Sequence, residues 1–192
     1  MTLSALDESA ALVVIDLQNG IVGMPTRPHP PSEVVARTAA LADAFRATGR
    51  LVVLVRVSLR PDGSDSAPGR TEVAGGLSDL PPGWDEIVDA LAGYAEDVVV
   101  TKRNWGAFHG TDLDVQLRRR GVTQVVLTGI ATSAGVESTA RAAHEHGYHV
   151  AVVTDAVADR DEETHRHSIE RIFPRLGETG TTAEVLGLIA PA

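Results

Sequence analysis

The chain has 192 residues, of which 43% are hydrophobic and 22% are charged, and it carries a formal net charge of −9 at pH 7. This length and apolar content suit a single domain, 1–192, with a substantial hydrophobic core. The acidic balance argues against a nucleic-acid-binding protein, and the absence of cysteine excludes a disulfide scaffold, a thiolate zinc site and a cysteine nucleophile.

Short valine-rich apolar runs alternate along the chain with longer amphipathic segments. The runs are apolar at successive positions, which is typical of strands that are buried on both faces of a parallel sheet. In chain order, the expected strands are 11–15, 51–57, 98–101, 124–128 and 149–154, with a short sixth strand near 177–180. The expected helices are 32–48, 112–120, 136–145, 161–173 and 182–189.

A strand followed by a helix, five times over, predicts an α/β fold in which helices cover both faces of a parallel sheet. The segment 60–83 breaks this rhythm, because it is rich in Gly, Pro, Ser and Asp and has almost no periodicity. Loops of this length in compact domains are usually functional lids or interface arms.

No apolar run approaches the ~20 residues that span a bilayer. The first ten residues, MTLSALDESA, also lack the basic and apolar regions of a secretory signal. We therefore expect a cytoplasmic protein with no membrane partner.

Two charged residues stand where strands end, which is where parallel sheets bind their ligands. Asp16 directly follows the first expected strand, and Lys102, the only lysine of the chain, follows the third. A buried carboxylate is expensive unless it is paired or used, and a lysine can act as a compact point charge. The alternatives are an aspartate that caps a turn and a lysine that is present by chance.

A turn of small residues, 129–136, follows the fourth strand and enters a helix. Such a turn presents backbone N–H groups at a positive helix end and suits an anion or an oxyanion. At 4 Å and an effective dielectric near 20, an Asp16–Lys102 attraction would be about 4 kcal/mol and would favour the ionised acid. Desolvation acts the other way, so both an acid and a base role stay open for Asp16.

Three segments carry a resemblance to a known family: DLQNG at 16–20, KRNWGAFHGTDLD at 102–114 and TGIATSAGVESTARAA at 128–143. With these motifs the chain resembles the isochorismatase-like hydrolases over about 11–188, nearly its whole length. The resemblance implies a three-layer α/β/α sandwich with a six-stranded parallel sheet, which is Rossmann-like. It also implies a homo-oligomer, a dimer or a tetramer.

The same resemblance implies an Asp–Lys–Cys triad, with Asp16 and Lys102 in the first two places. It implies a cis peptide between Ile130 and Ala131 that turns the Ala131 N–H into an oxyanion hole. The family's cysteine position is Gly135 in this chain, so thiolate attack is impossible there. The chain is thus similar to a branch of the superfamily that lacks the cysteine.

The resemblance to true isochorismatases implies hydrolysis of a vinyl ether without a covalent nucleophile, in which the aspartate protonates the enol-ether carbon. The resemblance therefore implies a hydrolase for a small, anionic metabolite, either a vinyl ether such as isochorismate or a related small molecule. Asp16 is then the general acid or base, Lys102 holds the substrate anion, and the N–H groups of Ala131 and Gly135 bind the oxygen that gains charge. The side chains expected to line the pocket are Gln18, Trp105, Phe108, Thr132 and Ser133.

Two other functions stay open at this point. The first is a catalytically silent member that binds or scaffolds a ligand, and the second is a small-amide hydrolase that uses Ser133 as its nucleophile. Packing under the loop is the alternative for Trp105 and Phe108. The histidines of the nicotinamidase metal set are missing, since no histidine lies between His29 and His109. We expect no metal, no cofactor and no nucleic acid, with a small-molecule substrate as the partner.

Overall fold

Six parallel strands form one sheet in this computed structural model, which describes residues 3–66, 69–72 and 79–189. The strand order is β3-β2-β1-β4-β5-β6. The strands are β1 Ala10–Ile15, β2 Leu51–Val57, β3 Val98–Lys102, β4 Gln124–Ile130, β5 His149–Ala158 and β6 Glu178–Gly180. The expected α/β fold with a six-stranded parallel sheet is confirmed.

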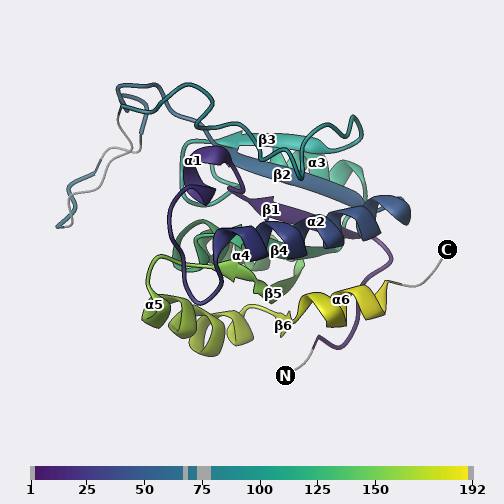
Figure 1. Cartoon of the computed structure of the whole chain (residues 1–192). Helices are drawn as coiled ribbons and strands as arrows, with labels where there is room; N and C mark the ends of the chain where they lie inside the picture. The colour runs from purple at the N-terminus through teal and green to yellow at the C-terminus, as the bar shows by residue number, and fades with distance from the viewer. Residues whose placement is uncertain (1–2, 67–68, 73–78, 190–192) are drawn as a thin grey trace.

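Helices lie on both faces of the sheet (Figure 1). They are α1 Asn19–Val22, α2 Pro31–Ala47, α3 Leu113–Arg119, α4 Glu137–Glu145, α5 Glu162–His167 and α6 Thr182–Leu188. A π-helical turn, η1 (Thr132–Val136), leads into α4. A second π-helical turn, η2 (Ser168–Ile172), and a 3-10 turn, η3 (Phe173–Arg175), follow α5. None of the described helices is long and apolar enough to cross a membrane.

The strand β1 explains why the molecule has three layers, since all six of its residues are buried. Successive side chains of a strand point to opposite faces. Val13 and Ile15 therefore pack with α3 and α4, whereas Leu12 and Val14 pack with α2 and α6. A strand that is apolar at every position can bury both faces only between two helical layers.

The connection between β2 and β3 is a loop, as the aperiodic segment 60–83 predicts. In the described part of 58–97 the chain forms turns and one isolated bridge, between Gln18 and Ile87, but no helix. Because no helix covers that corner, Val99 of the edge strand β3 is 54% exposed. Within the loop 60–83, residues 67–68 and 73–78 lie outside the described residues, and its expected role as a lid or arm stays a prediction.

The strand β5 is four residues longer than the expected strand 149–154. Leu127 of β4 pairs with Val152, and Gly129 pairs with Val157, so the residues 153–156 form a bulge in β5. Thr154 and Asp155 interrupt the apolar run at this bulge, which explains why the sequence pattern predicts the strand end too early. The bulge lets β5 continue to the rim of the sheet.

Candidate active site

The ends of three strands bring Asp16, Lys102 and Gly135 together. Lys102 closes β3 and extends past the end of β2 to donate a hydrogen bond from Nζ to Asp16 Oδ2 at 2.7 Å. Both side chains are buried, and the pair forms a salt bridge. The juxtaposition that the sequence predicts is therefore present.

The backbone of Asp16 has a left-handed conformation, with φ of +53°. Such a conformation is uncommon for a residue with a side chain, and it costs on the order of 1–3 kcal/mol unless the surroundings fix it. The Asp16 N–H donates to the carbonyl of Val55 at 2.9 Å, and the Asp16 carbonyl accepts from Gln18 N–H at 2.9 Å. These bonds fix the turn that directs the carboxyl towards Lys102.

The side chain of Gln18 belongs to the fold, which corrects the expectation that it lines the pocket. It is fully buried, and its Nε2 donates to the Val57 carbonyl at 2.9 Å while its Oε1 accepts from the Val57 N–H at 2.8 Å. Val57 is also paired in register with Lys102. The Gln18 amide therefore joins the segment after Asp16 to the strand beside Lys102.

Burial raises the pKa of Asp16 from 3.8 to about 6, although the neighbouring Lys102 ammonium lowers it. The two causes act against each other, and desolvation is the larger one. The second carboxyl oxygen, Oδ1, is buried and makes no hydrogen bond. A carboxyl in this state carries a proton in a substantial fraction of molecules near pH 6 and has a free oxygen with which to transfer it.

Lys102 has one further hydrogen bond, from Nζ to the carbonyl of Asn104 at 3.1 Å. An ammonium group has three donors, so these two bonds leave one donor for a ligand. Lys102 can therefore hold the Asp16 carboxyl and an anionic substrate group at the same time.

Gly135 lies directly opposite this ion pair. A Cβ atom placed on Gly135 would be 3.2 Å from Asp16 Oδ2, 3.5 Å from the carbonyl oxygen of Trp105 and 2.9 Å from Ile15 Cγ2. The position that holds cysteine in the resembled family thus faces the Asp16–Lys102 pair. In this chain that position contributes space, and a side chain there would require Ile15 to move.

The turn before Gly135 contains the expected cis peptide, between Ile130 and Ala131. The Ala131 carbonyl accepts from the N–H groups of Ala134 and Val136, both at 3.2 Å, which closes the turn into η1. We call the residues 131–135 the amide cradle. The oxyanion role of the Ala131 and Gly135 N–H groups stays a prediction.

Two of the expected pocket side chains lie elsewhere. The hydroxyl of Thr132 is fully buried against His165 of α5, with Oγ1 and Nδ1 2.9 Å apart, so it is directed to the helix α5. Phe108 stacks on the ring of His146 with 5.0 Å between centroids, at the end of α4 opposite Gly135. Phe108 therefore packs against a neighbouring ring, which is the alternative given above for this residue.

Trp105 and Ser133 remain candidates, each with a qualification from the geometry. Trp105 reaches the site with its carbonyl oxygen, while the residue as a whole is 71% exposed. Ser133 donates its backbone N–H to Asp159 Oδ2 at 2.6 Å. No hydrogen bond among the described residues joins the Ser133 hydroxyl to Asp16 or Lys102, a link that an activated serine needs.

Sequence reasoning missed Asp159 and Trp84. Asp159 follows the apolar end of β5 directly, as Asp16 follows β1, and that placement is the signal that could have identified it. Trp84 packs against Gly20, where a Cβ atom would lie 1.9 Å from the indole ring. The glycine of the DLQNG motif therefore makes room for a residue of the connection between β2 and β3.

The Isochorismatase domain family matches residues 10–184. The chain belongs to the isochorismatase family. It is 42% identical to the uncharacterized isochorismatase family protein YecD of Escherichia coli O157:H7 over 182 residues, which are 95% of this chain and 97% of YecD. It is 43% identical to the uncharacterized isochorismatase family protein YwoC of Bacillus subtilis over 187 residues, 96% of each chain.

A solved structure gives the same assignment for the fold. An isochorismatase family protein from Burkholderia thailandensis is 50% identical, with a TM-score of 0.93 over 96% of this chain and 97% of that one. The chain is thus an isochorismatase-family hydrolase with the family's α/β fold.

Proposed function

We propose that this isochorismatase-family hydrolase cleaves a small anionic vinyl ether, of the class to which isochorismate belongs, without a covalent enzyme intermediate. One observation carries the proposal. The Asp16 carboxyl is buried, has a pKa raised to about 6 and keeps one oxygen unpartnered, beside a glycine at the family's nucleophile position. The site therefore contains an acid but no nucleophile at the place where the family has one.

In the proposed reaction, protonated Asp16 transfers its proton to the terminal carbon of the vinyl ether and leaves an oxocarbenium ion. A water molecule adds to the cationic carbon, and the proton that it releases returns to Asp16. The resulting hemiketal breaks its carbon–oxygen bond and gives a carbonyl compound and an alcohol. General acid catalysis of this kind is worth typically 10²–10⁴-fold.

The ammonium group of Lys102 is the reason to propose an anionic substrate. Its two hydrogen bonds to Asp16 and Asn104 leave one ammonium donor for a substrate carboxylate. The amide cradle presents a helix N-terminus on the opposite side of the site, and that end favours negative charge. The homo-oligomer, a dimer or a tetramer, and the cytoplasmic location stay predictions.

The test is incubation of the purified protein with isochorismate, with other vinyl ethers and with small amides, followed by product analysis. We expect vinyl ethers to be consumed while the intact mass of the protein stays unchanged during turnover. Failure to consume any vinyl ether, or an acylated protein during amide turnover, would overturn the proposal.

A ligand-binding role without turnover is the second candidate, and the missing side chain at Gly135 favours it. A thermal-shift screen separates the two functions. A metabolite that raises the melting temperature and is never consumed supports the binding role, whereas one that is consumed supports the hydrolase. Gly135→Cys complements the screen, since a gain of amidase activity would show that the Asp16–Lys102 frame can still serve a thiol.

A further inference from the structure

The carboxyl group of Asp159 caps the amide cradle from a different strand. Its Oδ2 accepts the Ser133 N–H at 2.6 Å, and its Oδ1 accepts the Arg160 N–H at 2.7 Å. Ala131, the residue before the helical turn η1, provides no side-chain cap of its own. Asp159 thus takes the place of a helix N-cap although it lies 26 residues from Ser133.

Backbone bonds in both directions fix the position of Asp159. Its carbonyl accepts the Arg27 N–H at 2.6 Å, and its N–H donates to the Arg27 carbonyl at 2.8 Å. Asp159 is buried, so few other conformations are open to it. The carboxyl is therefore presented to the cradle by a rigid pair of segments.

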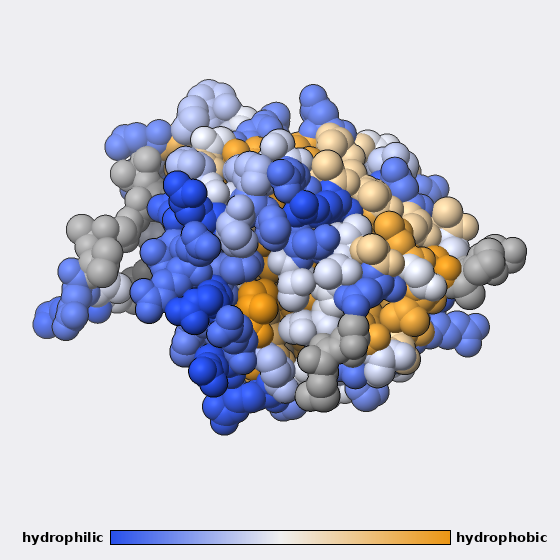
Figure 2. Space-filling view, turned by 60° about the horizontal axis from the view of Figure 1, so that its bottom comes forward, coloured by the Kyte–Doolittle hydropathy of each residue, from blue (hydrophilic) through white to orange (hydrophobic). Residues whose placement is uncertain are grey.

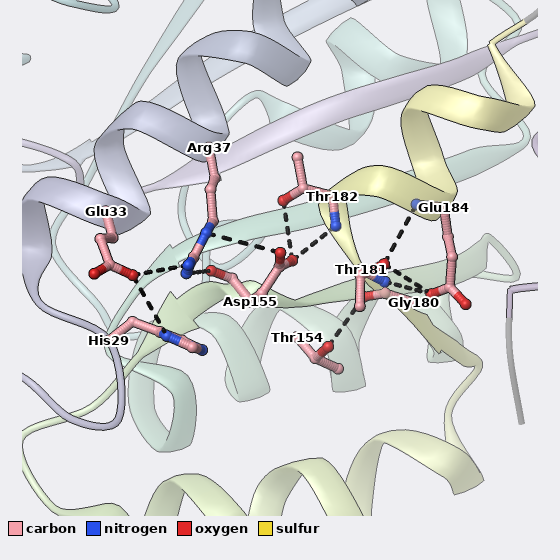
Figure 3. Close-up of polar contacts among 9 residues, drawn as sticks. All are labelled: His29, Glu33, Arg37, Thr154, Asp155, Gly180, Thr181, Thr182 and Glu184. Carbon is pink, nitrogen blue, oxygen red and sulfur yellow. Dashed lines mark hydrogen bonds and ion pairs between the residues drawn. The ribbon is translucent and has the colours of Figure 1, made fainter.

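The bulge of β5 is also stabilised just before Asp159 (Figure 3). Arg37 of α2 donates to the Asp155 carbonyl at 2.6 Å. The Asp155 Oδ1 accepts from the Thr182 N–H at 2.7 Å and from the Thr182 hydroxyl at 2.9 Å. These contacts tie the bulge to α2 and α6, and they determine where β5 leaves the sheet.

The helix that follows β5 contacts the cradle as well. His165 meets the Thr132 hydroxyl, and the Ser168 hydroxyl donates to Glu137 Oε2 at 2.6 Å in the first turn of α4. The solvent side of this helix is covered by hydrophilic residues, deep blue at the left of Figure 2. On the inner side of the chain after β5, His165 therefore contacts the cradle and Ser168 contacts the first turn of α4, while the outer side faces water.

We propose that Asp159 is a positioning residue that determines which cradle amides a substrate anion can use. The inference rests on the proposed function, because it assumes that the cradle receives a negatively charged oxygen. The Asp159 carboxylate occupies the Ser133 N–H, so the anion is directed to the Gly135 side of the cradle, next to Asp16. Its negative charge at the helix N-terminus also weakens the affinity of the cradle for anions.

Three variants separate this role from a purely structural one. Asp159→Asn removes the charge and keeps one acceptor oxygen for Ser133, while the bond from the Arg160 N–H is lost. The KM for an anionic substrate therefore falls about twofold to fivefold with little change in kcat. Asp159→Ala leaves the Ser133 N–H without its acceptor, so kcat falls about tenfold. The matched control is Asp161→Asn, because Asp161 also caps a helix, through Thr164 N–H at 2.8 Å, but lies exposed at the start of α5.

The kinetic outcome decides the inference. For the control we expect a small loss of melting temperature and wild-type kinetic constants. Unchanged kcat and KM in both Asp159 variants, with only a lower melting temperature, would mean that Asp159 serves stability alone and would overturn the inference.

A binding measurement separates this inference from the proposed function. Acetate, as a minimal carboxylate, is titrated into isotope-labelled protein while the amide NMR signals of Ser133 and Gly135 are followed. We expect the Gly135 signal to shift in the wild type, and acetate to bind about twofold to fivefold more tightly in Asp159→Asn. Equal or weaker binding in the variant, or no shift in either protein, would overturn the inference. If no vinyl ether is turned over, the proposed function fails while this titration still decides the role of Asp159.

Discussion

The ends of β1 and β5 each place a buried aspartate at the rim of the sheet, and the two carboxyls differ in how they are paired. Asp16 is 6% exposed and Asp159 is 5% exposed, so burial does not distinguish them. Asp159 has a backbone N–H on each oxygen, whereas Asp16 has Lys102 on one oxygen and no partner on the other. The comparison indicates that hydrogen-bond saturation separates a carboxyl that holds structure from one that can transfer a proton.

The two regions also differ in their backbone. Asp16 has a positive φ within a tight turn, while Asp159 lies in an extended pairing with Arg27. A conformation of the first kind persists only when surrounding contacts fix it, and such residues cluster at functional sites. We therefore expect substitutions at the end of β1 to affect catalysis more than substitutions at the end of β5.

The largest expected effect is the loss of turnover in Asp16→Asn. The substitution is nearly isosteric, and asparagine tolerates a positive φ, so the turn should be kept. Because the proton donor is gone, we expect kcat/KM for a vinyl ether to fall about 10²–10⁴-fold. The loss should exceed that of either Asp159 variant; an Asp16→Asn enzyme that keeps more than a tenth of wild-type activity would remove the distinction between the two carboxyls.

The next effect concerns the support of the β1 end. Gln18→Leu removes the side-chain amide that pairs with both backbone groups of Val57 and leaves them buried without partners. We expect the free energy of unfolding to fall by about 2–4 kcal/mol, measured by urea denaturation. The control Gln116→Leu, at the surface of α3, should change it by no more than about 0.5 kcal/mol. Equal effects at the two sites would mean that the buried amide has no special role.

A smaller effect is expected from a methyl group at the empty nucleophile position. In Gly135→Ala the new Cβ is 2.9 Å from Ile15 Cγ2, and such crowding of a core costs about 1–3 kcal/mol of stability. Gly187→Ala in α6 is the control, since a Cβ there meets nothing within 4 Å and should stabilise by about 0.4–1 kcal/mol. Thermal unfolding of both variants measures the contrast, and a stabilised Gly135→Ala would show that the site accepts a side chain freely.

The last effect is the pH dependence of turnover, which changes the protonation of one group and alters no contact. The folded-state pKa of Asp16 is raised to about 6, so the carboxyl is protonated below that pH and loses its proton above it. As a general acid it should give a kcat/KM that is level below pH 6 and falls about tenfold per pH unit above it. Since the Lys102 ammonium lowers the pKa of Asp16, Lys102→Met should move this break to higher pH. If kcat/KM instead rises as the pH increases through 6, Asp16 acts as a base and the acid mechanism is wrong.

Strand patterning made much of the site predictable. Asp16 and Lys102 each stand directly after an apolar run, and parallel strands bring their carboxyl ends to one rim. The small-residue turn before Gly135 enters a helix at the same rim, as the pattern indicates. These conclusions depend only on residue types in local order, which the chain itself contains.

Other features could not be predicted from local order. Gln18 and Phe108 are polar and aromatic residues within the motifs, yet both serve the fold, because their partners Val57 and His146 lie far along the chain.

By itself, the sequence determined the parallel sheet, the strands that Asp16, Lys102 and the small-residue turn follow, and the absence of a thiol at Gly135. Only the tertiary structure decided which oxygen of Asp16 stays unpaired and that Asp159 caps the cradle. The physical reason is that both states depend on hydrogen bonds between residues far apart in the sequence. Lys102 and Asp16 are separated by 86 positions, and Ser133 and Asp159 by 26 positions. Hydrogen bonds between such distant residues, and the burial of their side chains, are fixed by tertiary packing and are not encoded in a local sequence pattern.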